Sequence, residues 1–205
     1  MSKIAFDPGD DSIAANYAEV CHRERYVATL IECLETAPRE ESELYGDYDA
    51  WYLGAMEDSL IRRVFIIEAQ EWRRQIEDLL RDQLSRSGLD SGLWDTVKEG
   101  HDSRSLLVRL RDVLADDLDA RVPEETWAGL QEVIDVAAAL ESSSPRSLEV
   151  VRERYPSYFP EVDAFGSGAL RLDLKPEHVR RAFAAIKAFW DPVKGLPHQS
   201  TAEAS

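Results

Sequence analysis

Glu19 and His22 are the first residues whose types and spacing suggest chemistry, because together they form a Glu-x-x-His pattern. Two such patterns, with two further glutamates, hold the metals of a di-iron helical bundle. No second pattern occurs in the 205 residues, and neither Cys-x-x-Cys nor His-Glu-x-x-His is present. We therefore predict no metal site and no cofactor, and we expect His22 to be a partly exposed histidine beside the core.

The patterns that could support a nucleophile or a phosphate site are incomplete. Cys21 and Cys33 stand twelve residues apart, so about 18 Å would separate them on one helix, which is too far for a disulfide. Cys21 and His22 are neighbours, and neighbours on a helix point about 100° apart, which is poor geometry for a catalytic dyad. Gly166 and Gly168 flank a serine without the preceding strand or the Lys-Ser/Thr ending of a phosphate-binding loop. We expect reduced, structural cysteines.

Arg171 and His178 are the remaining catalytic candidates, an arginine and a histidine with six residues between them. A histidine can carry a proton near neutral pH. Pro176 stands between the two residues, where a helix is expected to begin, so they do not lie along one helix. Spacing alone assigns them no role.

The net charge of the chain is −16, and it is uneven. Residues 1–58 carry four basic and fourteen acidic side chains, a balance of −10. Phosphate backbones repel a chain this acidic unless a local basic face overrides the total, so we do not expect nucleic acid as a partner. Solubility explains such an excess. The alternative is an acidic surface that docks on a basic protein or mimics nucleic acid, and its candidate partner-binding residues are Glu40, Glu41, Glu43, Asp47 and Asp49.

Arginines between residues 59 and 111 provide the one argument for a nucleic-acid face. Ten basic residues meet nine acidic ones there, and Arg62 and Arg73 are eleven apart, which returns them to nearly the same side of a helix. The competing interpretation is ion pairing between residues four apart on one helix. We favour this pairing, which predicts the pairs Arg73 with Glu77, Arg74 with Asp78, and Glu77 with Arg81.

The residues Ser59–Ser85 form the longest amphipathic segment, and the rest of the chain is organised around it. It would span about 39 Å as a helix. Seven apolar residues recur in it at helical spacing: Ile61, Phe65, Ala69, Trp72, Ile76, Leu79 and Leu80. Three further residues widen this apolar face: Val64, Ile66 and Ile67.

Shorter amphipathic segments flank this central helix on both sides. Pro38 ends the first of them, the turn Ser142–Pro145 separates two others, and Pro176 opens the last. Leu170, Leu172 and Leu174 alternate with charged residues, but three repeats are too few for a sheet. The sequence predicts an all-α fold, a single antiparallel bundle of five or six main helices over residues 12–191, with a flexible N-terminus (1–11) and a disordered tail (192–205).

Three places in the chain resemble the bacterial members of the HEPN-like group, small all-α domains named for higher eukaryote and prokaryote nucleotide binding. The first is the central helix ending in LLRDQL, followed by a glycine-rich break that holds Leu93 and Trp94. The second is the helix Val133–Leu140, which runs through a polar turn into LEVVRERYPSYF, and the third is the closing helix that ends at Trp190. The likeness extends over residues 49–190.

The resemblance implies a nuclease motif that this chain departs from. HEPN ribonucleases share an Arg-x4–6-His motif whose arginine and histidine meet across a dimer to cut RNA. Where the histidine turn should stand, this chain has residues 141–145, Glu-Ser-Ser-Ser-Pro. Serine cannot carry a proton as histidine does near neutral pH. Arg171 and His178 match the bare spacing only.

Three functions follow as hypotheses. The leading one is a non-catalytic HEPN-like protein that acts through protein–protein contacts or as a homodimer, as an accessory or regulatory component of a bacterial defence or toxin–antitoxin system. One alternative is a metal-independent HEPN-type endoribonuclease that uses Arg171 and His178. The other is an acidic protein that mimics nucleic acid or sequesters a basic protein. No apolar run approaches the ~20 residues of a membrane span, and no charged-then-apolar leader opens the chain, so we expect a cytoplasmic protein without membrane contact.

Overall fold

The computed structural model describes residues 11–36, 48–87, 107–108, 110–111, 122–159 and 171–194. Every regular element within these ranges is a helix, and no strand occurs among them. The elements are α1 (Asp11–Thr36), α2 (Tyr48–Ser87), α6 (Glu124–Ser142), α7 (Pro145–Arg154), the short 3-10 helix η1 (Pro156–Tyr158) and α8 (Pro176–Lys194). The predicted all-α bundle is confirmed.

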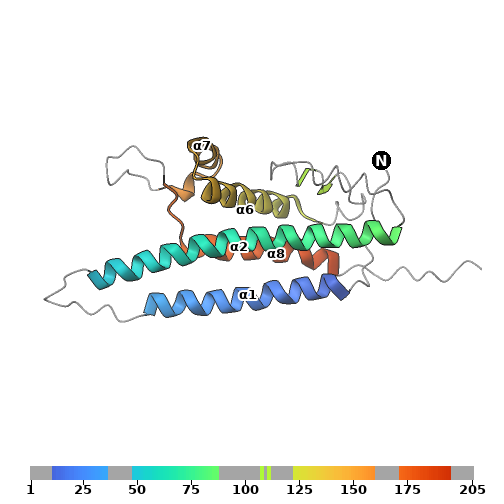
Figure 1. Ribbon diagram of the computed structural model, residues 1–205, viewed down its shortest axis with the longest axis horizontal. Coiled ribbons are helices and arrows are strands. Elements are labelled where there is room, and N and C mark those ends of the chain that lie inside the picture. Colours follow the sequence, from blue (N-terminus) through green and yellow to red (C-terminus); the bar gives the residue numbers. More distant parts are fainter. Residues whose placement is uncertain are drawn as a thin grey trace, which may run out of the picture.

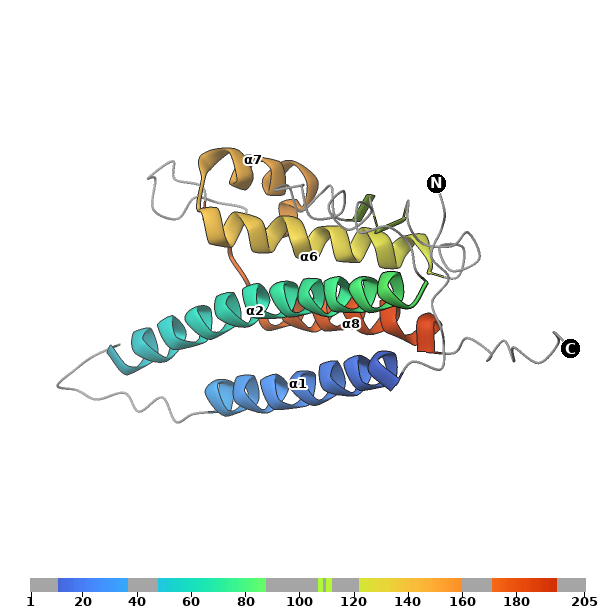
Figure 2. The same cartoon turned by 45° about the vertical axis from the view of Figure 1, so that its right-hand side comes forward.

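Four long helices pack side by side, and α7 lies against α6 (Figure 1). The helices α2 and α8 occupy the middle, with α1 on one side and α6 on the other, as the rotated view in Figure 2 also shows. Helix α1 runs antiparallel to α2, because Glu19 contacts Gln75 and Arg23, one turn later, contacts Glu68. The bundle is therefore of the antiparallel type in which successive long helices reverse direction.

Helix α2 extends at its N-terminal side beyond the amphipathic segment Ser59–Ser85. It begins at Tyr48 and continues for 40 residues, a length of about 60 Å. Its N-terminal end extends beyond the end of α1 (Figures 1 and 2). None of the side chains of residues 51–60 is buried, and Ile61 is the first that is.

Helix α8 shares the central position with α2, whereas the sequence predicted α2 alone as the central helix. It packs against α1, α2 and α6. The ring of Phe189 makes edge contacts with Trp72 of α2 and Trp127 of α6, at centroid distances of 5.7 Å each, and with Trp190 at 5.1 Å. These aromatic contacts join three helices at one point of the core.

The turn between α6 and α7 confirms the predicted break at residues 142–145. Ser143 adopts a left-handed backbone (φ 48°), and its N–H donates to the carbonyl of Ala139, so the last turn of α6 is closed. Ser144 caps α7 by accepting a hydrogen bond from the Ser147 N–H at 3.2 Å, and Pro145 fills the first helical position.

The alternation of leucines with charged residues around Leu172 does not come from a β-sheet. Residues 171–175 have no regular secondary structure, yet Leu172 and Leu174 are buried while Arg171, Asp173 and Lys175 are exposed. The Asp173 N–H donates to the Tyr158 carbonyl at 2.7 Å. Arg62 Nη2 donates to the Leu172 carbonyl at 2.5 Å, which ties this segment to α2.

Two helical glycines allow a matched stability test. A Cβ at Gly129 would lie 2.9 Å from Ala185 Cβ, because α6 and α8 approach closely there, whereas a Cβ at Gly54 would meet nothing within 4 Å. We expect Gly129→Ala to lower the free energy of unfolding by about 1–3 kcal/mol through overpacking. We expect Gly54→Ala to raise it by roughly 0.5–1 kcal/mol, since alanine favours the helix. Urea unfolding of both variants measures the two changes in the free energy of unfolding. Changes of the same sign would contradict the expectation.

Candidate functional site

The two catalytic candidates make separate contacts. Arg171 is exposed, and its Nη2 lies 3.2 Å from Asp58 Oδ2 on α2. His178 is only 4 % exposed, and its ring stacks on Tyr158 with centroids 4.2 Å apart. No hydrogen bond or ion pair among the described residues joins Arg171 to His178. The structure therefore places them in two environments instead of bringing them together.

The contacts of His178 are those of a residue that positions a helix. Its Nδ1 accepts a hydrogen bond from the backbone N–H of Lys175 at 3.0 Å, just before α8 begins. Since Nδ1 accepts, the neutral ring carries its proton on Nε2. Burial lowers the pKa of His178 below its ordinary 6.5, and the positive charge of Arg181 adds to this effect. The ring is therefore neutral near neutral pH.

The lowered pKa of His178 predicts an acid-sensitive stability. When the folded-state pKa lies below the unfolded value of 6.5, the unfolded chain takes up the proton first, so stability is lost as pH falls below 6.5. We expect His178→Asn, which keeps an acceptor near the Nδ1 position, to be less stable at neutral pH through loss of stacking. The difference in unfolding free energy between wild type and variant should shrink as the pH falls. Denaturant titrations on either side of pH 6.5 test this, and a constant difference would contradict it.

Beside His178, a polar cluster joins α6, η1 and α8. The Tyr158 hydroxyl donates to Glu132 Oε1 at 2.6 Å, and Arg181 Nη2 lies 3.2 Å from the same oxygen. Burial, helped by the Glu132 carboxylate, raises the pKa of Tyr158 well above its ordinary 10. Arg181 also lies over the Tyr158 ring at 5.5 Å. A phenol held protonated in this way is a structural donor and not a base.

A shallow groove of about 310 Å³ runs between α6 and α8 next to this cluster. Glu132, Tyr158 and Arg181 line one part of it, and the remaining wall is mostly small side chains. His178 is not among the lining residues. Glu132, Tyr158 and Arg181 are bound to one another in this groove, so none of these three side chains is free to activate a nucleophile.

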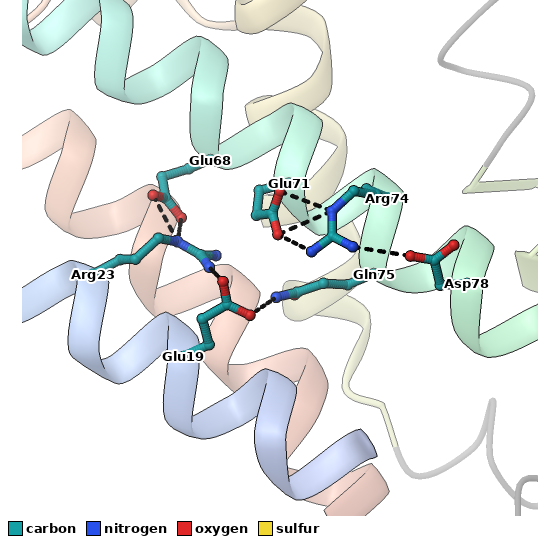
Figure 3. A network of polar contacts seen from close by, with 7 residues as sticks. All are labelled: Glu19, Arg23, Glu68, Glu71, Arg74, Gln75 and Asp78. Atoms are coloured by element: carbon teal, nitrogen blue, oxygen red, sulfur yellow. Dashed lines mark hydrogen bonds and ion pairs between the residues drawn. The ribbon is translucent and has the colours of Figure 1, made fainter.

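A second polar network lies between α1 and α2 (Figure 3). Arg23 Nε donates to both oxygens of Glu68 at 3.0 Å, although Glu68 is only 3 % exposed. Arg23 Nη1 also lies 2.8 Å from Glu19 Oε1, and Glu19 in turn accepts from Gln75 Nε2 at 3.2 Å. Burial raises the pKa of Glu68, and the guanidinium of Arg23 opposes that rise. No sequence pattern predicts this pair, because Arg23 and Glu68 are 45 residues apart in the chain.

Most of the described arginines of α2 form ion pairs with carboxylates on the same helix. Arg73 pairs with Glu77 at 2.8 Å and Arg74 with Asp78 at 3.0 Å, so these two predicted pairs are confirmed. Arg74 also contacts Glu71, whose pKa this hydrogen bond lowers. Arg81 lies 3.1 Å from Asp78, at three residues' spacing. Ion-paired arginines have little capacity left for phosphates, which supports the pairing interpretation over a nucleic-acid face.

The Glu-x-x-His pattern on α1 gathers no further metal-ligand side chains among the described residues. Glu19 is engaged by Arg23 and Gln75, and His22 is exposed instead of partly exposed as predicted. Within the described ranges no group of three or more His, Cys, Asp or Glu side chains is placed to hold a metal ion. Both cysteines are free, Cys21 half-buried and Cys33 exposed.

The predicted acidic partner-binding residues fall mostly outside the described ranges. This holds for Glu40, Glu41, Glu43 and Asp47, and of Asp49 only the backbone is described, in the first turn of α2.

Large apolar side chains are exposed along α2 itself: Trp51 is 66 %, Tyr52 51 %, Met56 43 % and Ile67 53 % exposed. The prediction that Ile67 widens the apolar face was wrong. The side of α2 that packs against the bundle is narrower than the run of apolar residues in the sequence, so Ile67 is exposed.

No helix within the described ranges is long and apolar enough to cross a membrane. Comparison of the chain with protein-family models, with curated proteins and with solved structures gives no match.

Proposed function

We propose that this chain is a non-catalytic helical protein that acts through protein–protein contacts. We place it, by the HEPN-like resemblance of its sequence, as an accessory or regulatory component of a bacterial defence or toxin–antitoxin system. The observation that carries the proposal is the exposed apolar surface of α2, with Trp51 at its N-terminal end. Tryptophan and tyrosine are the residues most enriched among the energetically important positions of protein interfaces.

The sequence around this surface supports a basic partner. The acidic residues 40, 41, 43, 47 and 49 immediately precede Trp51 and Tyr52 in the chain. Opposite charge steers association and raises the encounter rate, while buried aromatic rings supply affinity. An acidic segment beside exposed aromatics is therefore suited to a protein that carries lysine or arginine beside an apolar patch.

The endoribonuclease hypothesis has less support. Its candidate Arg171 is ion-paired with Asp58. Its candidate His178 stacks on Tyr158 and accepts a hydrogen bond from the Lys175 N–H. The neutral, stacked His178 ring is engaged at Nδ1, and the groove nearby is lined by other residues. We therefore propose the contact function ahead of RNA cleavage.

A capture experiment tests the proposed function. Immobilised wild-type protein should retain a basic protein from an extract of the source cells at low salt, and Trp51→Ala should reduce the amount retained by about tenfold, a loss of ~1.4 kcal/mol. Tyr26→Ala is the matched control, since Tyr26 is an exposed aromatic on α1 (63 %). High salt should weaken retention because the steering charges are screened. Equal retention by wild type and Trp51→Ala would contradict the proposal.

A further inference from the structure

His178 completes part of a capping box at the start of α8. Its Nδ1 accepts the backbone N–H of Lys175, the residue before the helix, at 3.0 Å, and the His178 N–H donates to the Lys175 carbonyl at 2.9 Å. In a capping box a glutamate or glutamine at this third helical position accepts the N–H that Nδ1 accepts here. We name this bond to Nδ1 the histidine cap. It depends on a side chain whose ordinary pKa is 6.5.

The histidine cap fastens one end of a short strap, residues 171–175, that leads into α8. Towards the other end, the backbone of the strap bonds to the Arg62 side chain of α2 at 2.5 Å and to the Tyr158 carbonyl of η1 at 2.7 Å. Leu172 and Leu174 are buried. Because the strap has no regular secondary structure, its attachment depends on individual hydrogen bonds and on these two leucines.

A proton on Nδ1 removes the histidine cap in two ways. The nitrogen loses the lone pair that accepts the Lys175 N–H, and it then carries an N–H of its own that faces this donor. The charged ring also lies in the first turn of α8, where the helix dipole opposes a cation. A neutral ring therefore holds the strap, and a charged ring does not.

The surroundings of the ring decide how readily it takes up this proton. Titratable or charged side chains face it from three elements and from the strap: Tyr158 of η1, Glu132 of α6, Glu177 and Arg181 of α8, and Lys175. Of the two carboxylates, Glu132 is already bound by Tyr158 and Arg181, and Glu177 is exposed. Burial and the charge of Arg181 lower the pKa of His178. The cap is thus intact at neutral pH and loses stability as the pH falls below 6.5.

We propose that residues 171–175 form an acid-released strap with His178 as its catch. When the buried ring takes up a proton, the histidine cap breaks, the strap leaves η1 and α2, and Leu172 and Leu174 become exposed. The long helices stay packed, because contacts such as those of Phe189 with Trp72 and Trp127 join them without the strap. The strap is separate from the contact surface around Trp51, so its test is independent of the proposed function.

Hydrogen exchange of the whole chain, measured by mass spectrometry and corrected for the intrinsic exchange rate at each pH, tests the proposal. Peptides that cover residues 171–178 should lose protection by up to about tenfold for each pH unit below 6.5. Peptides from α2 and α6 should keep their protection over the same range. Unchanged protection of the strap, or an equal loss in all helices, would overturn the proposal.

Matched substitutions identify the group responsible. His178→Gln keeps an acceptor of the capping-box type that does not titrate, so protection of its strap should not fall with pH. His22→Gln, at an exposed histidine of α1, should respond as wild type does. A strap that loses protection equally in wild type and His178→Gln would overturn the proposal.

The wild-type chain gives a second readout that needs no substitution. The nuclear magnetic resonance signals of the His178 ring should titrate below pH 6.5, over the range in which the strap loses protection. At neutral pH they should show the tautomer with its proton on Nε2, since Nδ1 is the acceptor. A ring that titrates at pH 6.5 or above, or that carries its proton on Nδ1 at neutral pH, would overturn the proposal.

Discussion

Glu68→Ala should lower the free energy of unfolding by about 3–5 kcal/mol, the cost of leaving a buried charge without its partner. Glu68 is 3 % exposed and accepts both of its 3.0 Å contacts from Arg23 Nε. Without the carboxylate, Arg23 retains only the more exposed Glu19. Urea unfolding, monitored by circular dichroism, measures this change as a lower midpoint urea concentration with an unchanged dependence of the unfolding free energy on urea concentration.

Two control variants show whether burial of the charge is the cause. Glu24→Ala removes a carboxylate that lies 2.6 Å from Lys187 Nζ but is about a third exposed, so it should cost only ~0–1 kcal/mol. Replacing both Arg23 and Glu68 by methionine and leucine should restore most of the lost stability, since a buried pair can be exchanged for apolar residues at little cost. Equal costs for Glu68→Ala and Glu24→Ala would show that burial is not the deciding factor.

Phe189→Ala should cost about 3–5 kcal/mol by opening a cavity at the centre of the bundle. The side chain is fully buried, and its ring contacts Trp72, Trp127 and Trp190 from three helices. The edge contacts add roughly 0.5–1.5 kcal/mol per pair beyond the buried area. The near-ultraviolet circular dichroism of the tryptophans should weaken at the same time, because their fixed environment is lost.

Phe189→Leu is the matched variant for this position. It keeps an apolar side chain and leaves a smaller cavity, so its cost should be clearly below that of alanine. The near-ultraviolet signal should still change, since the ring contacts are removed. A leucine variant as unstable as the alanine variant would indicate that the aromatic edge contacts, and not the filled volume, dominate at Phe189.

The sequence alone determined the local structure. Helical periodicity predicted the long helices, the residues 142–145 predicted the break before α7, and four-residue spacing predicted the Arg73–Glu77 pair. These features depend on groups within a few residues of one another, so the local sequence contains the whole cause. The HEPN-like resemblance and the acidic partner-binding segment stay predictions.

Only the tertiary structure decided which residues face the core and which are exposed. Glu68 is buried and Ile67 is exposed, although they are neighbours of opposite character, because the position of α1 and not hydrophobicity selects the inner side of α2. Arg171 and His178 are separated for a similar reason. The irregular segment 171–175 places Arg171 against Asp58, and the start of α8 places His178 on Tyr158. Such contacts join residues far apart in the chain, so their geometry depends on how the helices pack and not on any local spacing.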